Sequence, residues 1–193
     1  MAVTRPWTSI LTGVYGILEC LFRHTTVLAT REVRNVGTTK KTLIVFSDDF
    51  DKVLAAFVIA NGAAAMGDDV TMFFTFWGLN VLRKPAAEPH EKSMLQGMLS
   101  QMMPKGPGEL TLSKAGFGNM GAEMMRNVMR EENVSSLEEL VETAKEQGIK
   151  MIACKMSMDL LGLHEDELVD GLEFVGVASY LAEADEASVN LFI

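Results

Sequence analysis

Short, continuously apolar runs alternate with longer segments of helical periodicity from about Lys41 to the end of the chain. The strands predicted from these runs span residues 42–46, 70–76, 150–154, 172–175 and 189–193. The runs are apolar on successive residues, which is typical of strands buried on both faces of a parallel sheet. Helical segments between strands favour parallel pairing. The pattern therefore predicts an α/β, flavodoxin-like three-layer fold with a five-stranded, mainly parallel sheet.

Two of the predicted helices have well-defined ends. The alanine-rich segment 51–66 is apolar nearly all round, so we expect it to pack closely against the sheet and to end at Gly67. The amphipathic segment 136–147 stops at Gly148, directly before the third strand. Further helices are expected in a short stretch after that strand and in segment 177–187.

A long insert separates the second strand from segment 136–147. It contains four prolines and predicts helical stretches near 91–103 and 119–131. Its methionines are patterned, because Met94, Met98 and Met102 recur every four residues. Flexible thioether side chains suit an adaptable surface for a partner or a membrane, although packing within a core or a subunit interface explains most such stripes. The sequence thus predicts a methionine-rich helical insert in the sheet.

The chain divides into an N-terminal extension, residues 1–40, and one domain, residues 41–193. Within the extension, residues 10–22 are apolar apart from Thr12 and Glu19. This run is shorter than the ~20 residues that span a bilayer. It remains open whether it is an amphipathic tail or a targeting or membrane segment.

Charge and cysteine content narrow the function classes. The formal net charge is −9, and no cluster of lysines and arginines offers a phosphate-binding surface, so we expect no nucleic-acid partner. The two cysteines, Cys20 and Cys154, have no metal-ligand spacing and fit a reducing compartment. We therefore expect a cytoplasmic protein without metal or organic cofactor, with membrane association as an alternative.

Cys154 is the leading candidate for chemistry. It ends the third predicted strand and precedes a helix, and open parallel sheets bind ligands at the carboxyl ends of their strands. The helix N-terminus and the neighbouring Lys155 would both favour the thiolate, which is the nucleophilic form. The pattern alone fits equally well a small buried apolar residue, which is what most free cysteines are.

Polar residues after the first strand and an aromatic residue after the second would meet Cys154 at the same sheet edge. Ser47, Asp51 and Lys52 are candidates for lining a pocket there, and Trp77 is a candidate for roofing it. Helix capping explains the acidic residues without any such role. Core packing explains Trp77 in the same way.

Several segments resemble the DsrE/DsrF/DsrH-like sulfur-relay family, especially a branch with the pattern Ala-Cys-x-Met-Ser-Met-Asp. Here the pattern reads Ala153-Cys154-Lys155-Met156-Ser157-Met158-Asp159. Ser47 with Asp51-Lys52, segment 60–67 and segment 73–79 are also similar, and the likeness runs from about 41 to 193. The resemblance implies a homo-oligomeric, flavodoxin-like domain that passes persulfide sulfur among carrier proteins.

The resemblance also implies roles for residues. Cys154 would accept the sulfur, with Lys155 and Ser157 beside it in the motif. The partners would be persulfide donor and acceptor proteins, such as small sulfur carriers or rhodanese-like proteins, so the activity would be that of a sulfurtransferase if it is enzymatic. Cys20 lies outside the likeness. The alternative is a non-catalytic interaction or membrane-adaptor subunit in which Cys154 is structural.

Overall fold

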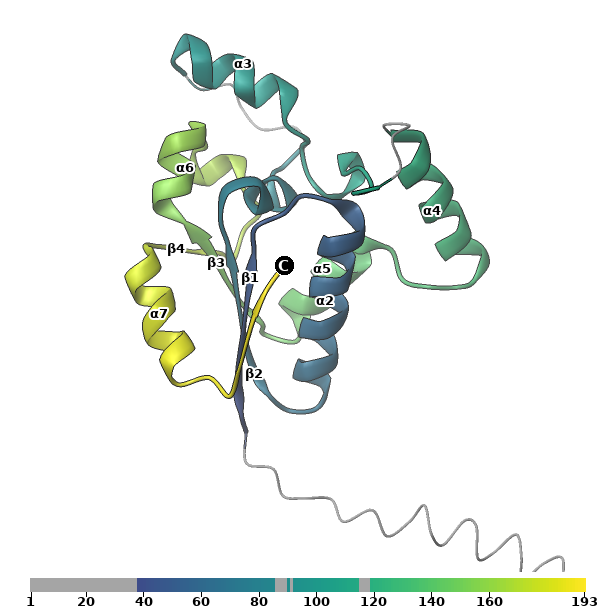
Figure 1. Ribbon diagram of the computed structural model, residues 1–193, viewed down its shortest axis with the longest axis vertical. Coiled ribbons are helices and arrows are strands. Elements are labelled where there is room, and N and C mark those ends of the chain that lie inside the picture. The colour runs from purple at the N-terminus through teal and green to yellow at the C-terminus, as the bar shows by residue number, and fades with distance from the viewer. Residues whose placement is uncertain (1–37, 86–89, 91, 115–118) are drawn as a thin grey trace, which may run out of the picture. The chain divides into compact units, whose positions relative to one another are not determined.

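The computed structural model describes residues 38–193 apart from 86–89, 91 and 115–118, so the extension up to residue 37, with Cys20, lies outside the described residues. All five predicted strands are present. They are β1 (Lys40–Val45), β2 (Asp69–Phe74), β3 (Lys150–Cys154), β4 (Glu173–Val175) and β5 (Val189–Phe192). They pair in parallel in the order β4-β3-β2-β1-β5 (Figure 1). The prediction of a five-stranded parallel α/β fold is confirmed.

The helices cover the two faces of the sheet unequally. Figure 1 shows α2 (Phe50–Ala65) and α5 (Leu137–Glu146) on one side and α7 (Val177–Asp185) on the other. The short helix α6 (Lys155–Leu161) follows β3 directly and is succeeded by the single turn η4 (Glu165–Glu167). Crossovers between parallel strands are right-handed, so the direction of a crossover decides which face of the sheet its helix covers. The β4–β5 crossover runs across the sheet in the direction opposite to the steps from β1 to β4, and α7 therefore covers the other face.

The main hydrophobic core lies between the sheet and the α2/α5 layer. Its largest fully buried side chains include Leu43, Phe57, Phe74 and Leu137. The expected close packing of α2 holds for its inner side only. Val58 and Ile59 on its outer side are 53% and 42% exposed, so the helix is apolar all round without being covered all round.

The structure confirms that the predicted insert is helical. Two elements connect it to the sheet: its own first segment, η2, and the helix α6. The elements of the insert are the 3-10 segment η2 (Phe76–Leu82), α3 (Met94–Met102), the turn η3 (Pro107–Glu109) and α4 (Asn119–Glu131). Gly78 of η2 crosses the end of β1 so closely that a Cβ atom there would lie 2.1 Å from the Val45 carbonyl oxygen. Only glycine fits this crossing.

Arg83 anchors the insert, a role that no local sequence pattern predicts. Arg83 is 3% exposed, and its guanidinium group donates a hydrogen bond to the Ser100 hydroxyl at 3.0 Å. It also donates to the carbonyl oxygens of Met103 and Pro104 at 3.4 and 3.3 Å. Burial lowers the pKa of the guanidinium, which nonetheless stays far above neutrality. These hydrogen bonds therefore connect Arg83, near the start of the insert, to the end of α3.

The helices in the described ranges include none that is both long enough and apolar enough to cross a membrane.

Candidate functional site at the end of β3

Cys154 is the last residue of β3 and has a free thiol that is almost fully buried, with 2% of the residue exposed. Alternation along the strand decides which way it points. Met151 and Ala153 join the core under α2 and α5, whereas Ile152 and Cys154 belong to a separate cluster on the opposite face. Cys154 therefore lies under α7, on the face with the thinner cover.

An aromatic pair closes this second cluster. The rings of Phe73 on β2 and Tyr180 on α7 stack with centroids 4.7 Å apart. The Tyr180 hydroxyl shares a 3.1 Å hydrogen bond with the Thr42 hydroxyl on β1. Beside them, Val175 of β4 is the strand partner of Cys154. Cys154, at 2% exposure, therefore belongs to a small packed cluster and is almost closed to solvent in this structure.

Ion pairs hold α7 over this face at its solvent-exposed margin. Glu183 pairs with Lys150 at 2.9 Å and with Lys40 at 3.7 Å, and Lys40 also pairs with Glu186. The hydrogen bond from Lys150 lowers the pKa of Glu183 and, reciprocally, raises the pKa of Lys150. Both shifts favour the charged forms of Glu183 and Lys150, so this pair is ionised at neutral pH.

The other two motif candidates flank Cys154 in different environments. Lys155 is exposed, and its ammonium group pairs with the Glu165 carboxylate at 3.5 Å, so part of its positive charge is already balanced. Ser157 is fully buried, and its hydroxyl shares a 2.8 Å hydrogen bond with the Thr75 hydroxyl at the end of β2. Ser157 therefore fixes α6 to the sheet edge.

The polar residues after β1 are engaged with one another rather than with Cys154. The Ser47 hydroxyl donates to the Asp49 carboxylate at 2.9 Å, and the Lys52 ammonium group donates to the same carboxylate at 2.5 Å. Asp49 is the N-cap residue of α2, but its side chain makes no cap hydrogen bond, so side-chain capping does not explain these residues; of the capping interpretation there remains only the acidic Asp51 in the first turn of the helix.

Asp51 connects α2 to the insert. Its carboxylate accepts hydrogen bonds from the Ser113 backbone N–H at 2.9 Å and from the Ser113 hydroxyl at 2.7 Å. Partial burial opposes ionisation of Asp51, but these two bonds outweigh it and hold its pKa below the ordinary value of 3.8. Asp51 thus anchors the segment that leads into α4.

Trp77 lies in η2 and is 39% exposed. Strand β2 separates β1 from β3, so the ends of these two strands are about 10 Å apart. In the described parts of the chain, no hydrogen bond or ion pair joins Cys154 to Ser47, Asp51, Lys52 or Trp77. Ser47, Asp51 and Lys52 therefore share the carboxyl edge with Cys154 without a polar contact to it, and Trp77 follows the neighbouring strand β2.

The immediate surroundings of Cys154 include residues that sequence reasoning missed. Tyr180 carried a usable signal, because it stands in an alanine-containing amphipathic helix and a buried tyrosine hydroxyl needs a partner. The identity of that partner, Thr42, follows only from the β4–β5 crossover, which carries α7 back across the sheet to β1.

Among the residues with described positions, no group of three or more histidine, cysteine, aspartate or glutamate side chains is arranged to hold an ion. The rings of His90 and His164 stack with centroids 4.2 Å apart, and His90 lies 2.7 Å from the Asp166 carboxylate. The imidazole of His90 lowers the pKa of Asp166, so this cluster acts as a contact between the insert and η4.

Comparisons with known proteins give a consistent family. Residues 38–192 match the sequence profile described as the DsrE/DsrF/DrsH-like family. The chain is 53% identical over 156 residues to the uncharacterized protein YrkE of Bacillus subtilis, covering 81% of this chain and 98% of YrkE. It is 35% identical over 158 residues to the sulfur carrier protein DsrE2 of Allochromatium vinosum, covering 80% of this chain and 98% of DsrE2.

Two solved structures are also similar. The ychN protein of E. coli aligns with a TM-score of 0.48 and 12% identity, covering 81% of this chain and all of ychN. The protein MTH1491 of Methanobacterium thermoautotrophicum aligns with a TM-score of 0.47 and 16% identity, covering 80% of this chain and 99% of MTH1491.

Proposed function

This chain belongs to the DsrE/DsrF/DrsH-like family, and from that premise we propose that it is a sulfur carrier relaying persulfide sulfur through Cys154 between protein partners. The 35% identity to a protein named as a sulfur carrier, over nearly its whole length, supports a role in sulfur relay in general. We place the chain in the branch with the Ala-Cys-x-Met-Ser-Met-Asp pattern, on the residues that form it here.

The position of Cys154 is the observation that carries the proposal. It ends an inner strand, with β2 and β4 on either side, at the carboxyl edge where parallel sheets bind their ligands. Cys154 is also the one cysteine within the described residues. A relay through a single thiol therefore has one candidate in this domain.

The proposed reaction conserves electrons without a cofactor. The Cys154 thiolate attacks the outer sulfur of a donor persulfide, R–S–SH, and a new S–S bond forms. The donor S–S bond breaks, and the donor leaves as a thiolate that takes up a proton. An acceptor thiolate then attacks the outer sulfur of Cys154–S–SH, and Cys154 leaves as the thiolate. We expect small sulfur carriers or rhodanese-like proteins as partners, in the cytoplasm.

Both steps require Cys154 to become accessible, and within the described residues α7 is the helix that contributes a buried side chain to the Cys154 cluster. Tyr180 is the single buried residue of α7, and the remaining contacts of this helix include the part-buried pair of Glu183 with Lys150 and, at its C-cap, the pair of Glu186 with Lys40. Elements with little buried apolar surface open at a fraction of the global unfolding free energy. Outward movement of α7 would uncover Phe73 and the thiol together.

Persulfide loading tests the proposal directly. The chain is incubated with a small-molecule persulfide donor, and the mass of each cysteine-containing peptide is measured. We expect one added sulfur atom on Cys154, loss of loading in Cys154→Ser, and retained loading in Cys20→Ser. Circular dichroism confirms that both variants are folded. A folded wild-type protein that gains no sulfur on Cys154 would contradict the relay.

A second function has one specific observation in its favour. The outer side of α3 is apolar and unpaired, with Met94, Leu95, Met98 and Met102 all at least 60% exposed. Together with the burial of Cys154, this favours a non-catalytic interaction or membrane-adaptor subunit. Alkylation separates the two functions, because a thiol that never opens stays unmodified in the folded protein, whereas a carrier thiol reacts through its open state.

We further propose that the chain forms a homo-oligomer. Besides α3, exposed apolar side chains occur on α2 at Val58 and Ile59, and on β5 at Phe192, which is 67% exposed. Strand β5 is an edge of the sheet, and exposed edges are commonly covered by another chain. Light scattering at micromolar concentration tests this proposal, and a monomer mass would contradict it.

A further inference from the structure

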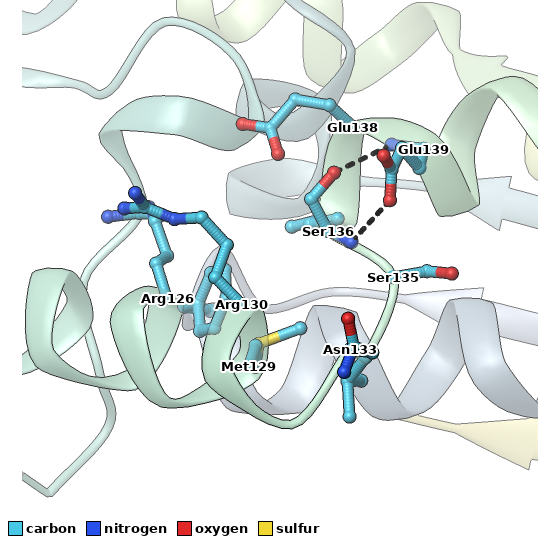
Figure 2. A pocket seen from close by; sticks show the side chains of 11 residues that line it. Arg126, Met129, Arg130, Asn133, Ser135, Ser136, Glu138 and Glu139 are labelled. Carbon is cyan, nitrogen blue, oxygen red and sulfur yellow. Dashed lines mark hydrogen bonds between the residues drawn. The ribbon is translucent and has the colours of Figure 1, made fainter.

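A well-formed cavity in the described part of the chain lies away from Cys154, between α4 and the start of α5. Its volume is about 530 Å³, within the range of small-molecule sites. Figure 2 shows arginines of α4 on one wall and the first turn of α5 on the other. Apolar side chains of Met129, Val134 and Leu137 contribute to the lining.

The α4 wall carries positive charge that lacks a carboxylate partner. Arg126 and Arg130 both line the cavity, one helical turn apart. Among the described residues, neither guanidinium has a carboxylate oxygen within 4 Å. Arg126 donates to the carbonyl oxygens of Pro107 and Leu110 at 3.2 and 3.0 Å, and Arg130 donates to the side-chain oxygen of Asn127 at 2.7 Å.

The opposite wall carries the same amount of negative charge. Glu138 and Glu139 stand in the first turn of α5, and both line the cavity. Glu139 accepts a 2.9 Å hydrogen bond from the Ser136 backbone N–H, which leaves its second oxygen free of that bond. Figure 2 shows the Glu138 carboxylate on the side of the arginines.

We propose that this cavity binds a small zwitterion, a free amino acid or short peptide, whose carboxylate faces Arg126 and Arg130 and whose ammonium group faces Glu138 and Glu139. A purely anionic ligand would meet two glutamates, and a purely cationic ligand would meet two arginines. A ligand with both charges complements both walls. The apolar lining at Met129, Val134 and Leu137 suits an aliphatic side chain.

Arg126 also has a structural role, which separates it from Arg130. Its guanidinium lies 4.8 Å from the centroid of the Phe50 ring, and its Nε atom is buried without a hydrogen-bond partner. Replacing Arg126 would therefore disturb the loop around η3 as well as the cavity. Arg130 is exposed and, within the described residues, bonds only to its own helix, so it reports on ligand binding more cleanly.

The site goes beyond the proposed sulfur relay and does not depend on it. The cavity is lined from α4, α5 and Phe50, whereas Cys154 belongs to the cluster on the other face of the sheet. Ligand binding in the Cys154→Ser variant, which has no relay cysteine, tests the site whatever the outcome of sulfur loading.

The test uses three probes that differ only in their end charges. These are the dipeptide Gly-Leu, its N-acetyl form without the ammonium group, and its C-terminal amide without the carboxylate. Binding to the full chain is followed by the backbone amide shifts of residues 133–139 and by calorimetry. Gly-Leu is expected to bind about fivefold more tightly than either modified form, because each modified form can make one fewer exposed ion pair with the cavity walls.

Two variants assign each charge to its wall. Arg130→Gln should weaken Gly-Leu and the acetylated form about fivefold but leave the amide unchanged, and Glu138→Gln should weaken Gly-Leu and the amide but leave the acetylated form unchanged. The controls are Lys105→Gln and Glu146→Gln, which make the same charge changes outside the cavity.

Three outcomes would overturn the proposal. The first is that none of the probes shifts residues 133–139 at millimolar concentration. The second is that the acetylated form binds as tightly as Gly-Leu, which would make this an anion site. The third is that the Arg130 and Glu138 variants behave like their controls.

Discussion

The hydrophobic clusters on the two faces of the sheet differ greatly in size. Under α2 and α5, the buried cluster includes Phe57, Phe74 and Leu137 and continues into the insert. Under α7, the buried cluster contains only four residues among those described: Phe73, Ile152, Cys154 and Tyr180. Since buried apolar area is the main source of stability, the first face holds the fold together and the second contributes little to it.

The difference bears on how a buried cysteine could act as a carrier. A thiol under α2 and α5 would become accessible only when the whole domain unfolds. Under α7, by contrast, one tyrosine and a few ion pairs near the surface hold the covering helix in place. We therefore propose that this face opens while the rest of the fold stays intact, which would expose the Cys154 thiol.

The largest expected effect on stability comes from a substitution on the face of the sheet under α2 and α5. Phe57 is fully buried, and its ring lies 6.1 Å from that of Phe74, so Phe57→Ala should lower the free energy of unfolding by about 3–5 kcal/mol. Denaturant unfolding followed by circular dichroism measures this decrease. A decrease under about 1 kcal/mol would mean that the α2 layer is not the stability-determining face.

A substitution on the face under α7 should change the accessibility of Cys154 more than the stability of the fold. Tyr180→Ala removes the ring that stacks on Phe73 and should speed alkylation of Cys154 about tenfold, which corresponds to about 1.4 kcal/mol less for opening α7. The reaction is followed in the Cys20→Ser background. Leu181→Ala is the matched control, because Leu181 is 52% exposed and covers little. Equal rates in the two variants would show that α7 does not control access.

The sequence predicted the elements well because their signals are local. The third strand and the second insert helix were predicted at 150–154 and 119–131, the bounds that β3 and α4 have. Apolar runs and glycine stops depend on neighbouring residues alone. For the same reason, the placement of Cys154 at a strand end could be predicted.

The surroundings of Cys154 could not be predicted, because they depend on long-range geometry. The run Lys150–Cys154 is apolar after its first residue and shows no alternation, so nothing in it distinguishes the face of Met151 from that of Cys154. The bond between Tyr180 and Thr42 joins residues 138 positions apart. The bond between Asp51 and Ser113 likewise depends on how the insert folds back.

A smaller effect is expected from the ion pairs that tether α7. Glu183→Gln should cost about 0.5 kcal/mol at pH 7, because ion pairs near the surface are weak. The Lys150 hydrogen bond lowers the folded-state pKa of Glu183, so this contribution is present above its ordinary pKa of 4.5 and disappears as the pH falls through the lowered value. The difference in Tm between wild type and variant should therefore shrink as the pH falls below 4.5 and vanish once Glu183 is protonated in both states. A difference that persists there, or one matched by the control Glu146→Gln, would contradict a charge tether.

The smallest effect on the isolated domain is expected from the outer side of α7. Val177 and Leu181 lie one turn apart and are 55% and 52% exposed, so replacing both with serine should change the free energy of unfolding of a monomer by less than about 0.5 kcal/mol. If a second copy of the chain covers this side, the same change places two hydroxyls in an apolar interface and should lower the assembly mass in light scattering at micromolar concentration. Alkylation of Cys154 would then become faster as well, since a covering subunit restrains α7. An unchanged mass, with an unchanged alkylation rate, would place the oligomer interface elsewhere and leave α7 restrained only by Tyr180 and its ion pairs.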